Sequence, residues 1–196
     1  MNDVRGKATT EELEVAIEIT PVWKQVTPEL KAELLAMWER NQAMRDPAQA
    51  SVRADQAVCI GRDGNGVLCA VGTAVVRVLP RLRQPMYYYR QFFSQEMRGQ
   101  RQTVPFFVRA REILQEYNTG LPKPESLGLL MELENPQLAA RYNSAEGAAA
   151  GTTFIGYSPR GMQLRVSYFE GATLLPPVDL PRRQGAMAGR RTANAR

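Results

Sequence analysis

A four-residue turn, Asp63-Gly64-Asn65-Gly66, separates two apolar runs and limits how this chain can fold. Asp-Gly and Asn-Gly pairs supply the backbone conformations that a tight β-hairpin turn needs. The flanking runs, residues 56–62 and 67–79, are therefore predicted to be neighbouring antiparallel strands. Gly72, within the second run, is a candidate position for a bulge. The fold must accordingly contain a sheet that includes this hairpin.

The remaining elements are predicted from apolar periodicity and from residues that begin helices. Thr27 and Pro28 suit the N-cap and the first position of a helix. Further strands are predicted at residues 14–19, 86–93, 127–134, 153–157 and 163–169, and helices at about 27–44, 104–117 and 136–150, with a short helix or a loop at 46–54. This order of strands and helices predicts an α/β (α+β mixed) fold in which helices flank a mixed sheet.

The 196 residues suit one folded domain with short tails. We expect the domain to cover residues 14–175, with a flexible segment at 1–13 and a disordered basic tail at 176–196. No apolar run approaches the roughly 20 residues that a membrane-spanning helix needs. The N-terminus lacks the apolar segment of a signal peptide. A cytoplasmic protein without membrane association is therefore expected.

The chain contains no histidine, which excludes several kinds of active site. Nucleophilic systems that depend on histidine cannot be built, and the usual catalytic zinc site loses its commonest ligand, so no metal site is predicted. Proton transfer is left to carboxylates, Tyr, Lys, Cys or water. Cys59 and Cys69 fall on successive strands of the hairpin and are interpreted as reduced, small core residues.

The net charge of +5 is concentrated at the C-terminal end. Residues 177–196 contain five Arg and one Asp, and the rest of the chain is nearly neutral. Nucleic-acid binding by the folded domain is therefore not favoured. A tail that associates with phosphate backbones in a salt-dependent way is kept as a minor alternative to a solvated tail.

Residues 86–117 are predicted to form an aromatic strand, a polar turn and a helix. Pro105 falls in the first helical turn, where no hydrogen-bond donor is lost. A helix N-terminus has free N–H groups and a partial positive charge, so it can hold a phosphate. Arg98 and Arg101 would add charge-assisted contacts. The turn is thus a candidate pyrophosphate site; the alternative is a basic, solvated loop at the start of a core helix.

The order of elements over residues 14–172 resembles that of the GNAT acyltransferase superfamily. In that family a strand leads into a turn of the type Arg/Gln-x-x-Gly-x-Gly/Ala and then a helix, and Arg98-Gly99-Gln100 is similar to the start of this turn. The following strand ends in Glu-Leu-Glu-Asn at residues 132–135. Tyr142 follows Asn135 by seven residues, which is similar to the family's Asn…Tyr spacing. The resemblance implies a GNAT-like, mostly antiparallel central sheet flanked by helices.

The resemblance also implies acetyl-CoA, or another acyl-CoA, as the acyl donor. Its pyrophosphate would lie on the turn and its pantetheine arm beside the end of the aromatic strand. The implied cofactor-binding residues are Phe92, Phe93, Ser94, Arg98, Gly99, Gln100, Arg101, Gln102, Thr103, Val104 and Asn135. The sequence departs from the family at Arg101 and Thr103, where small residues would let the backbone approach a phosphate closely.

Acyl transfer to an amine needs one group that takes a proton from the amine and another that protonates the leaving thiolate. Glu132 and Glu134 point to one face of their strand. A carboxylate with a raised pKa could serve as the base, and Glu132 is preferred. Tyr142 matches the position at which some GNAT enzymes place a general acid. The alternatives are ion-paired acids at a strand end and a phenol ring that packs in the core.

Tyr87 and Tyr89 share a strand face and are candidate residues of an acceptor-substrate pocket; ordinary core residues are the alternative. Arg81 and Arg83, in the loop at residues 80–85, hint at an anionic group on the acceptor. The acceptor itself is expected to be a small-molecule or peptide amine. Pairing of two copies through the exposed last strand is left open.

The function predicted from these features is an acyl-CoA-dependent N-acetyltransferase that transfers an acetyl group to an amine by direct attack in a ternary complex. The alternative is a catalytically degenerate domain of the same shape that acts as a protein-binding or regulatory module.

Overall fold

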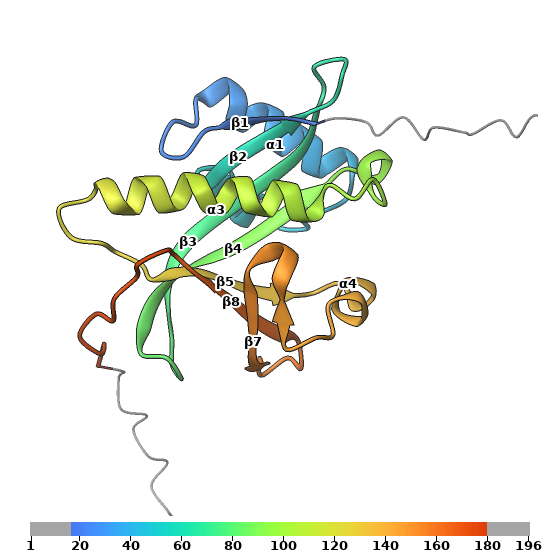
Figure 1. Cartoon of the computed structure of the whole chain (residues 1–196). Helices are drawn as coiled ribbons and strands as arrows, with labels where there is room; N and C mark the ends of the chain where they lie inside the picture. The colour runs from blue at the N-terminus through green and yellow to red at the C-terminus, as the bar shows by residue number, and fades with distance from the viewer. Residues whose placement is uncertain (1–16, 180–196) are drawn as a thin grey trace, which may run out of the picture.

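An eight-stranded sheet runs through the computed structural model, which describes residues 17–179 (Figure 1). The strand order is β1-β2-β3-β4-β5-β8-β7-β6, and every neighbouring pair is antiparallel except β4 and β5, which are parallel. The strands are β1 (Glu18–Pro21), β2 (Ala57–Arg62), β3 (Leu68–Leu79), β4 (Gln84–Phe93), β5 (Gly128–Leu133), β6 (Glu146–Gly147), β7 (Thr152–Tyr157) and β8 (Gln163–Tyr168). The prediction of a mixed, mostly antiparallel sheet is confirmed.

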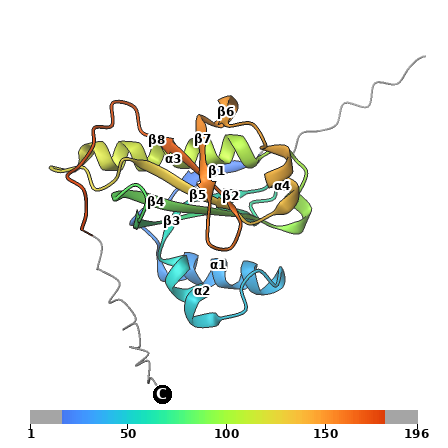
Figure 2. The same cartoon turned by 90° about the horizontal axis from the view of Figure 1, so that it is seen from below.

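Helices lie on both faces of the sheet, as predicted. Figure 2 shows α1 and α2 on one face and α3 on the other. Thr27 caps α1, because its hydroxyl accepts a hydrogen bond from the Leu30 amide at 3.2 Å. The helices are α1 (Pro28–Arg40), α2 (Pro47–Ala54), α3 (Thr103–Gly120) and α4 (Pro136–Arg141), with single 3₁₀ turns at Gln95–Met97 and Ala148–Ala150.

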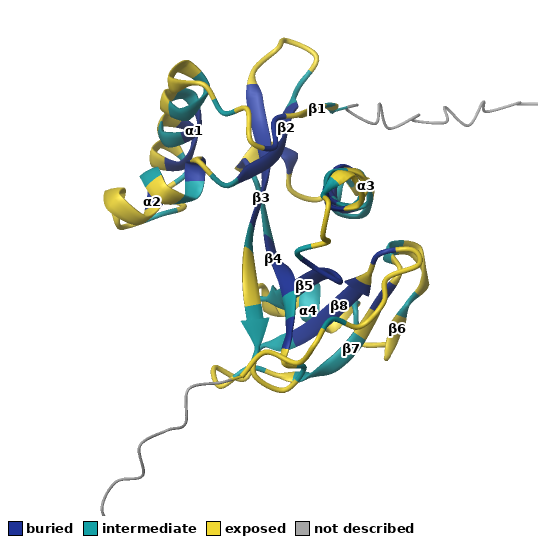
Figure 3. Ribbon diagram, turned by 90° about the vertical axis from the view of Figure 1, so that its left-hand side faces the viewer, coloured by how far each residue is buried: buried dark blue, intermediate teal, exposed yellow. Residues whose placement is uncertain are grey.

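Two apolar layers fill the space between the sheet and these helices, and buried residues concentrate on the central strands (Figure 3). The layer under α3 includes Tyr87, Tyr89, Phe106, Phe107 and Leu114. The layer under α1 and α2 includes Leu34, Met37, Trp38, Ile60 and Val71. Each such side chain contributes about 1.5–3 kcal/mol through burial. Together the layers fix β4, which supplies one wall of the site described below.

The hairpin predicted around residues 63–66 is confirmed and joins β2 to β3. The bulge predicted at Gly72 is wrong: the pairing shifts between Ala57 and Cys59 in β2, and again where Gly61 pairs with Ala70 and Arg62 with Leu68. Gly72 lies opposite the first shift, where a Cβ atom would come within 2.7 Å of the Tyr89 hydroxyl. Glycine at this position therefore leaves room for the Tyr89 ring to cross the strand.

Cys59 and Cys69 are buried and unbonded on these two strands, as predicted. Burial raises the pKa of Cys59 to about 12 and that of Cys69 to about 11. Neither thiol is therefore a ready nucleophile.

The helix predicted over residues 136–150 is wrong beyond its first turns, because α4 ends at Arg141. The chain then continues through β6 and a 3₁₀ turn. The cause is Arg165 on β8, whose guanidinium donates hydrogen bonds to three backbone carbonyls in the segment after α4, those of Tyr142, Ser144 and Ala145, at 3.1, 2.9 and 3.2 Å. These carbonyls are thereby turned away from a helical hydrogen-bond pattern.

The two chain ends differ in part from the prediction. β1 begins at Glu18, and residues 1–13 and 14–16 lie outside the described part of the chain. Residues 176–179, predicted to belong to a disordered tail, are held against the β3–β4 turn: the Val178 amide donates to the Arg83 carbonyl at 2.9 Å, and Arg83 pairs with Asp179 at 3.0 Å. The remaining predicted tail, 180–196, also lies outside the described residues.

Within residues 17–179, no helix combines the length and the apolar character needed to cross a membrane.

Candidate active site

The parallel strands β4 and β5 pair over a short stretch and then separate. Their paired residues run from Tyr87 and Leu129 to Tyr89 and Met131. Beyond this stretch β4 continues alongside β3, and β5 continues alongside β8. No described strand lies between the facing edges of β4 and β5 there. Their backbone N–H and C=O groups are consequently available to an extended molecule that enters the gap.

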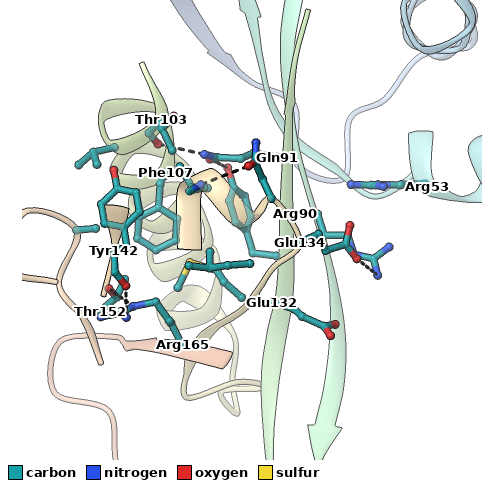
Figure 4. A pocket seen from close by; sticks show the side chains of 17 residues that line it. Arg53, Arg90, Gln91, Thr103, Phe107, Glu132, Glu134, Tyr142, Thr152 and Arg165 are labelled. Carbon is teal, nitrogen blue, oxygen red and sulfur yellow. Dashed lines mark hydrogen bonds and ion pairs between the residues drawn. The ribbon is translucent and has the colours of Figure 1, made fainter. Parts of the chain in front are cut away.

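A cavity of about 300 Å³ lies where the two strands separate (Figure 4). Its walls come from β4, the start of α3, β5 and the chain from α4 to β8, and Arg53 of α2 also contributes. The apolar side chains that line it include Val104, Phe107, Met131 and Leu138, and the polar ones include Gln91, Thr103, Tyr142, Thr152 and Arg165. This mixture suits an organic chain that carries a few polar groups.

The cavity has two chemically different sides, separated by the plane of the sheet. In Figure 4, Phe107, Tyr142 and Arg165 lie on the side of α3, whereas Glu132 and Glu134 point away from them. The division follows from the pleat, because alternate residues of a strand point to opposite faces. One side is therefore largely apolar and the other is rich in charge.

The turn before α3 reaches the cavity at Thr103 and Val104, which line it. The Gln91 side-chain amide donates to the Thr103 carbonyl at 3.2 Å and ties the start of α3 to the end of β4. Gly99 and Arg101 have φ angles of 88° and 55°. For Arg101 this left-handed conformation costs about 1–2 kcal/mol. It is one of the two positions at which the GNAT turn usually has glycine, the residue that adopts this conformation freely.

Glu132 lies in a network of hydrogen bonds on the charged side, with its side chain 9% exposed. The Tyr88 hydroxyl donates to it at 2.7 Å, and Arg160 pairs with it at 2.8 Å. Partial burial disfavours the charged carboxylate, but hydrogen bonds from Arg160, Ser158 and Tyr88 outweigh this and lower the pKa of Glu132 to about 2. The expectation of a raised pKa for Glu132 is therefore wrong.

Glu134 lies beside Glu132, and its side chain is half exposed. It pairs with Arg160 at 2.7 Å and with Arg90 at 3.7 Å. Arg160 comes from the turn between β7 and β8 and so binds both carboxylates. This ion-pair network ties β5 to that turn on the charged side of the cavity.

Tyr142 directly follows α4 and lines the cavity. In Figure 4 its hydroxyl points toward Thr103. Its backbone carbonyl is one of the groups bound by Arg165, which is 3% exposed. Arg165 also donates to Thr152 and Gln163, at 3.2 and 3.5 Å, and no acidic side chain in residues 17–179 pairs with it. Desolvation lowers the pKa of this guanidinium. Arg165 thus fixes the backbone that carries Tyr142.

The predicted cofactor-binding residues are placed in different ways. Thr103, Val104 and Asn135 line the cavity, and Arg98, Gly99, Gln100, Arg101 and Gln102 form the turn that precedes it. Asn135 also caps α4, because its side-chain oxygen accepts hydrogen bonds from the Gln137 and Leu138 amides at 2.9 and 3.3 Å.

Phe92, Phe93 and Ser94 do not line the cavity. Phe93 packs against Phe106 with ring centres 5.2 Å apart. Phe92 packs against the layer under α1 and α2, and Ser94 is buried near Cys69. The β4 wall is formed earlier in the strand, by Tyr89, Arg90 and Gln91.

The two candidate acceptor tyrosines also differ. Tyr89 lines the cavity, with its hydroxyl 3.1 Å from the Gln91 side-chain oxygen. Burial raises the pKa of Tyr89 well above its usual value, so it remains neutral. Tyr87 does not line the cavity: its hydroxyl donates to Glu125 at 2.7 Å and its ring packs edge-on against Trp23.

No role is predicted from the sequence for Arg53, Tyr88, Arg90, Arg160 or Arg165. For Arg165 a signal was present, since it interrupts an apolar strand at a position flanked by Leu164 and Val166. Arg53, which lines the cavity, and Arg160, which pairs with Glu132 and Glu134, come from a helix and a turn far from β4 in sequence, and nothing local predicts these positions.

Comparison with solved structures finds chains of similar fold at low sequence identity. The acetyltransferase of the GNAT family from Streptococcus pneumoniae is 11% identical with a TM-score of 0.48, and the match covers 79% of this chain and 99% of that one. A GNAT superfamily phosphinothricin acetyltransferase from Sinorhizobium meliloti, solved with acetyl-CoA, is 12% identical with a TM-score of 0.48, covering 83% and 95%. A protein described as a bacterial toxin is 13% identical with a TM-score of 0.49, covering 79% and 91%.

No known protein family matches the sequence, and no curated protein matches it.

Proposed function

We propose that this protein is an acyl-CoA-dependent N-acetyltransferase that transfers an acetyl group to an amine by direct attack in a ternary complex. The observation that carries the proposal is the separation of β4 and β5 into a cavity that ends at the N-terminus of α3. Open strand edges suit the amide groups of a pantetheine arm, as they suit an added peptide strand. The helix N-terminus suits a pyrophosphate.

The residues present fit such an acyl donor. The turn at residues 98–104 would hold the pyrophosphate through its backbone N–H groups, with Arg98 and Arg101 exposed at its surface to add charge. The strained φ angle of Arg101 supports this, because the backbone takes a conformation that glycine would also adopt and the side chain is exposed. Phe107 and Met131 would pack against the apolar part of the arm.

Bound acetyl-CoA would supply a thioester carbon for attack by the amine nitrogen and a thiolate as the leaving group. As the C–N bond forms, the C–S bond breaks, and the departing sulfur needs a proton. We assign the donation of this proton to the Tyr142 hydroxyl, which faces the apolar side of the cavity. Arg165 acts as a positioning residue, since it binds the Tyr142 carbonyl and not the reactants.

The proposed role of Glu132 follows from its lowered pKa. A carboxylate with a pKa of about 2 stays ionised but is a weak base. We therefore assign to it the stabilisation of positive charge that develops on the attacking nitrogen, whose proton then leaves through Glu134 or water. Both carboxylates line the cavity on the side opposite Tyr142. The carboxylates would therefore act on the amine from one face of the sheet, and Tyr142 would protonate the thiolate from the other.

Calorimetric titration of the full chain with acetyl-CoA tests the binding step. We expect micromolar binding that weakens by about tenfold in the double variant Arg98→Gln/Arg101→Gln, since two charge-assisted contacts are lost. Arg81→Gln, which removes one positive charge in the β3–β4 turn, is the control and should bind like the wild type. No binding at high micromolar acetyl-CoA would contradict the proposal and favour a non-catalytic binding module.

Release of free CoA thiol in the presence of amines tests the chemical step. Tyr142→Phe should lower kcat by about 10²-fold and leave acetyl-CoA affinity unchanged, because only the proton donor is removed. Glu132→Gln should lower kcat/KM for the amine. Unchanged rates in both variants would show that these residues are not catalytic, even if acetyl-CoA binds.

A further inference from the structure

A second hollow, of about 340 Å³, lies beside the charged side of the cavity, between α2, β3 and β4. The two spaces are adjacent, because Arg53 and Arg90 line both. The second hollow has an apolar part, formed by Met44, Ala48, Val52 and Val75. An acceptor whose nitrogen reached the gap between β4 and β5 would extend its remaining atoms into this hollow.

Three arginines of this hollow, Arg53, Arg77 and Arg90, each lie over an aromatic ring. The guanidinium carbons of Arg77 and Arg90 each lie 4.8 Å from the centre of the Tyr88 ring. Arg53 lies over Trp38, 5.8 Å from the ring centre, and its Nε donates to the Thr73 hydroxyl at 3.2 Å. The three guanidinium groups thus line one hollow, and each lies over an aromatic ring.

These guanidinium groups are short of anionic partners. Arg53 and Arg77 form no ion pair with any residue in the described part of the chain, and Arg90 reaches only Glu134, at 3.7 Å. The buried Nε of Arg90 has no hydrogen-bond partner within residues 17–179. Burial and the nearby charge of Arg90 lower the pKa of Arg53 to about 10, with only partial relief from Glu134. An anion in the hollow would satisfy these donors and reduce the repulsion.

We infer that this hollow binds an anionic group of the acceptor, so that the acceptor is an amine that also carries a carboxylate or a phosphate. The inference rests on the proposed function. The charges are arranged for such a molecule: Glu132 and Glu134 lie at the cavity, where the amine would react, and Arg53, Arg77 and Arg90 lie where its other end would reach. The arginines that line the hollow are different from Arg81 and Arg83, and Arg83 is paired with Asp179.

Three amines of similar size test the inference. 2-Aminoethyl phosphate carries a phosphate, β-alanine carries a carboxylate, and ethanolamine carries no anionic group. Each is titrated calorimetrically into the full chain, with and without CoA, and each is assayed as an acceptor of the acetyl group. We expect at least one of the two anionic amines to bind about tenfold tighter than ethanolamine. The stronger of the two identifies the anion.

Arg77→Gln is the main variant, because Arg77 is exposed and its loss should leave the fold intact. It should reduce the preference for the anionic amine by at least about threefold, and Arg53→Gln should reduce it further. Arg81→Gln, outside the hollow, should leave the preference unchanged. Equal binding of ethanolamine and both anionic amines, or a preference that survives both variants, would overturn the inference.

The outcomes separate this inference from the proposed function. If acetyl-CoA binds and ethanolamine is acetylated as well as the anionic amines, the proposed function stands and the anion site is wrong. If acetyl-CoA does not bind but an anionic amine binds in a way that depends on Arg77, the anion site stands and the acyltransferase proposal is wrong.

Discussion

At Glu132, burial and hydrogen bonding act on the same carboxyl group in opposite directions. The base predicted from the sequence is a carboxylate with a raised pKa, and the structure shows the opposite shift. The hydrogen bonds dominate because Arg160, from the β7–β8 turn, and Tyr88, from β4, both donate to it. Neither partner is close to Glu132 in sequence, so its charge state could not be read from β5 alone. The placement of Glu132 beside Glu134 on one strand face could be predicted, because it follows from the pleat.

The lowered pKa of Glu132 predicts a loss of stability in acid. The pKa lies below the ordinary value of about 4.3 that holds in the unfolded chain. The stabilisation is therefore fully present above about pH 5 and disappears as the pH falls toward 2. The shift corresponds to about 3 kcal/mol without screening; we expect about 1–2 kcal/mol, because Arg160 is 55% exposed.

Urea unfolding at pH 7 and pH 3 measures this contribution. The free energy of unfolding of the wild type should fall by about 1 kcal/mol more than that of Glu132→Gln, which cannot titrate, because at pH 3 a carboxyl group with a pKa of about 2 has lost only part of its stabilisation. Glu116→Gln, on the exposed surface of α3, serves as the control and should fall as much as the wild type. An equal fall in wild type and Glu132→Gln would show that the carboxyl is not stabilised in its charged form.

At the scale of single elements, local signals predicted helix starts well and one helix end badly. The cap of α1 was predictable because Thr27 bonds an amide three residues away. The end of α4 was not, because the group that terminates the helix is Arg165, which lies 23 residues beyond Tyr142 in the chain. The small residues of the segment 145–150 are compatible with a helix by propensity, and a tertiary contact overrides that preference.

Replacing Arg165 should weaken the hold on the segment between α4 and β7, because its guanidinium binds the backbone carbonyls there. In Arg165→Met, three backbone carbonyls lose their donor, and the removal of a buried charge offsets part of the cost. We expect the free energy of unfolding to fall by about 2 kcal/mol and amide hydrogen exchange in residues 142–152 to quicken. Arg141→Met, an exposed arginine at the end of α4, is the control and should change neither quantity. Unchanged exchange in Arg165→Met would mean that the segment is held by other contacts.

On the scale of the whole molecule, the sheet consists of two antiparallel halves joined through β4 and β5. The order of strands and helices predicts a mixed sheet from the sequence, and the turn at residues 63–66 predicts the pairing of β2 with β3 within one half. The separation of β4 and β5 could not be derived from residue patterns, because it depends on which strands pair with their outer edges. That separation creates the cavity. The resemblance indicates the general location of the candidate site, but it does not indicate which residues form the walls of the cavity.

The junction between the halves is fastened at one end by two buried polar side chains. The Ser126 hydroxyl accepts a hydrogen bond from the Tyr87 amide at 3.0 Å and donates to the Gly128 carbonyl at 2.8 Å, so it links β4 to the start of β5. Asn118, near the end of α3, donates to the Ser126 carbonyl at 3.0 Å and accepts from the amides of Glu125 and Ser126 at 2.9 and 3.1 Å. Both side chains are at most 5% exposed.

Asn118→Ala should therefore weaken the junction as well as the helix end. It leaves three backbone groups without partners, two of them buried and one partly buried, which costs about 3 kcal/mol in the free energy of unfolding. Asn143→Ala, an exposed asparagine, is the matched control and should cost less than about 0.5 kcal/mol. The proposed acyl donor would bridge β4 and β5 at the other end of their paired stretch. Acetyl-CoA at a hundredfold excess over its Kd should therefore raise the free energy of unfolding of the variant by about 2.7 kcal/mol. A loss no larger in Asn118→Ala than in Asn143→Ala, measured by urea unfolding, would show that the halves of the sheet are held together elsewhere.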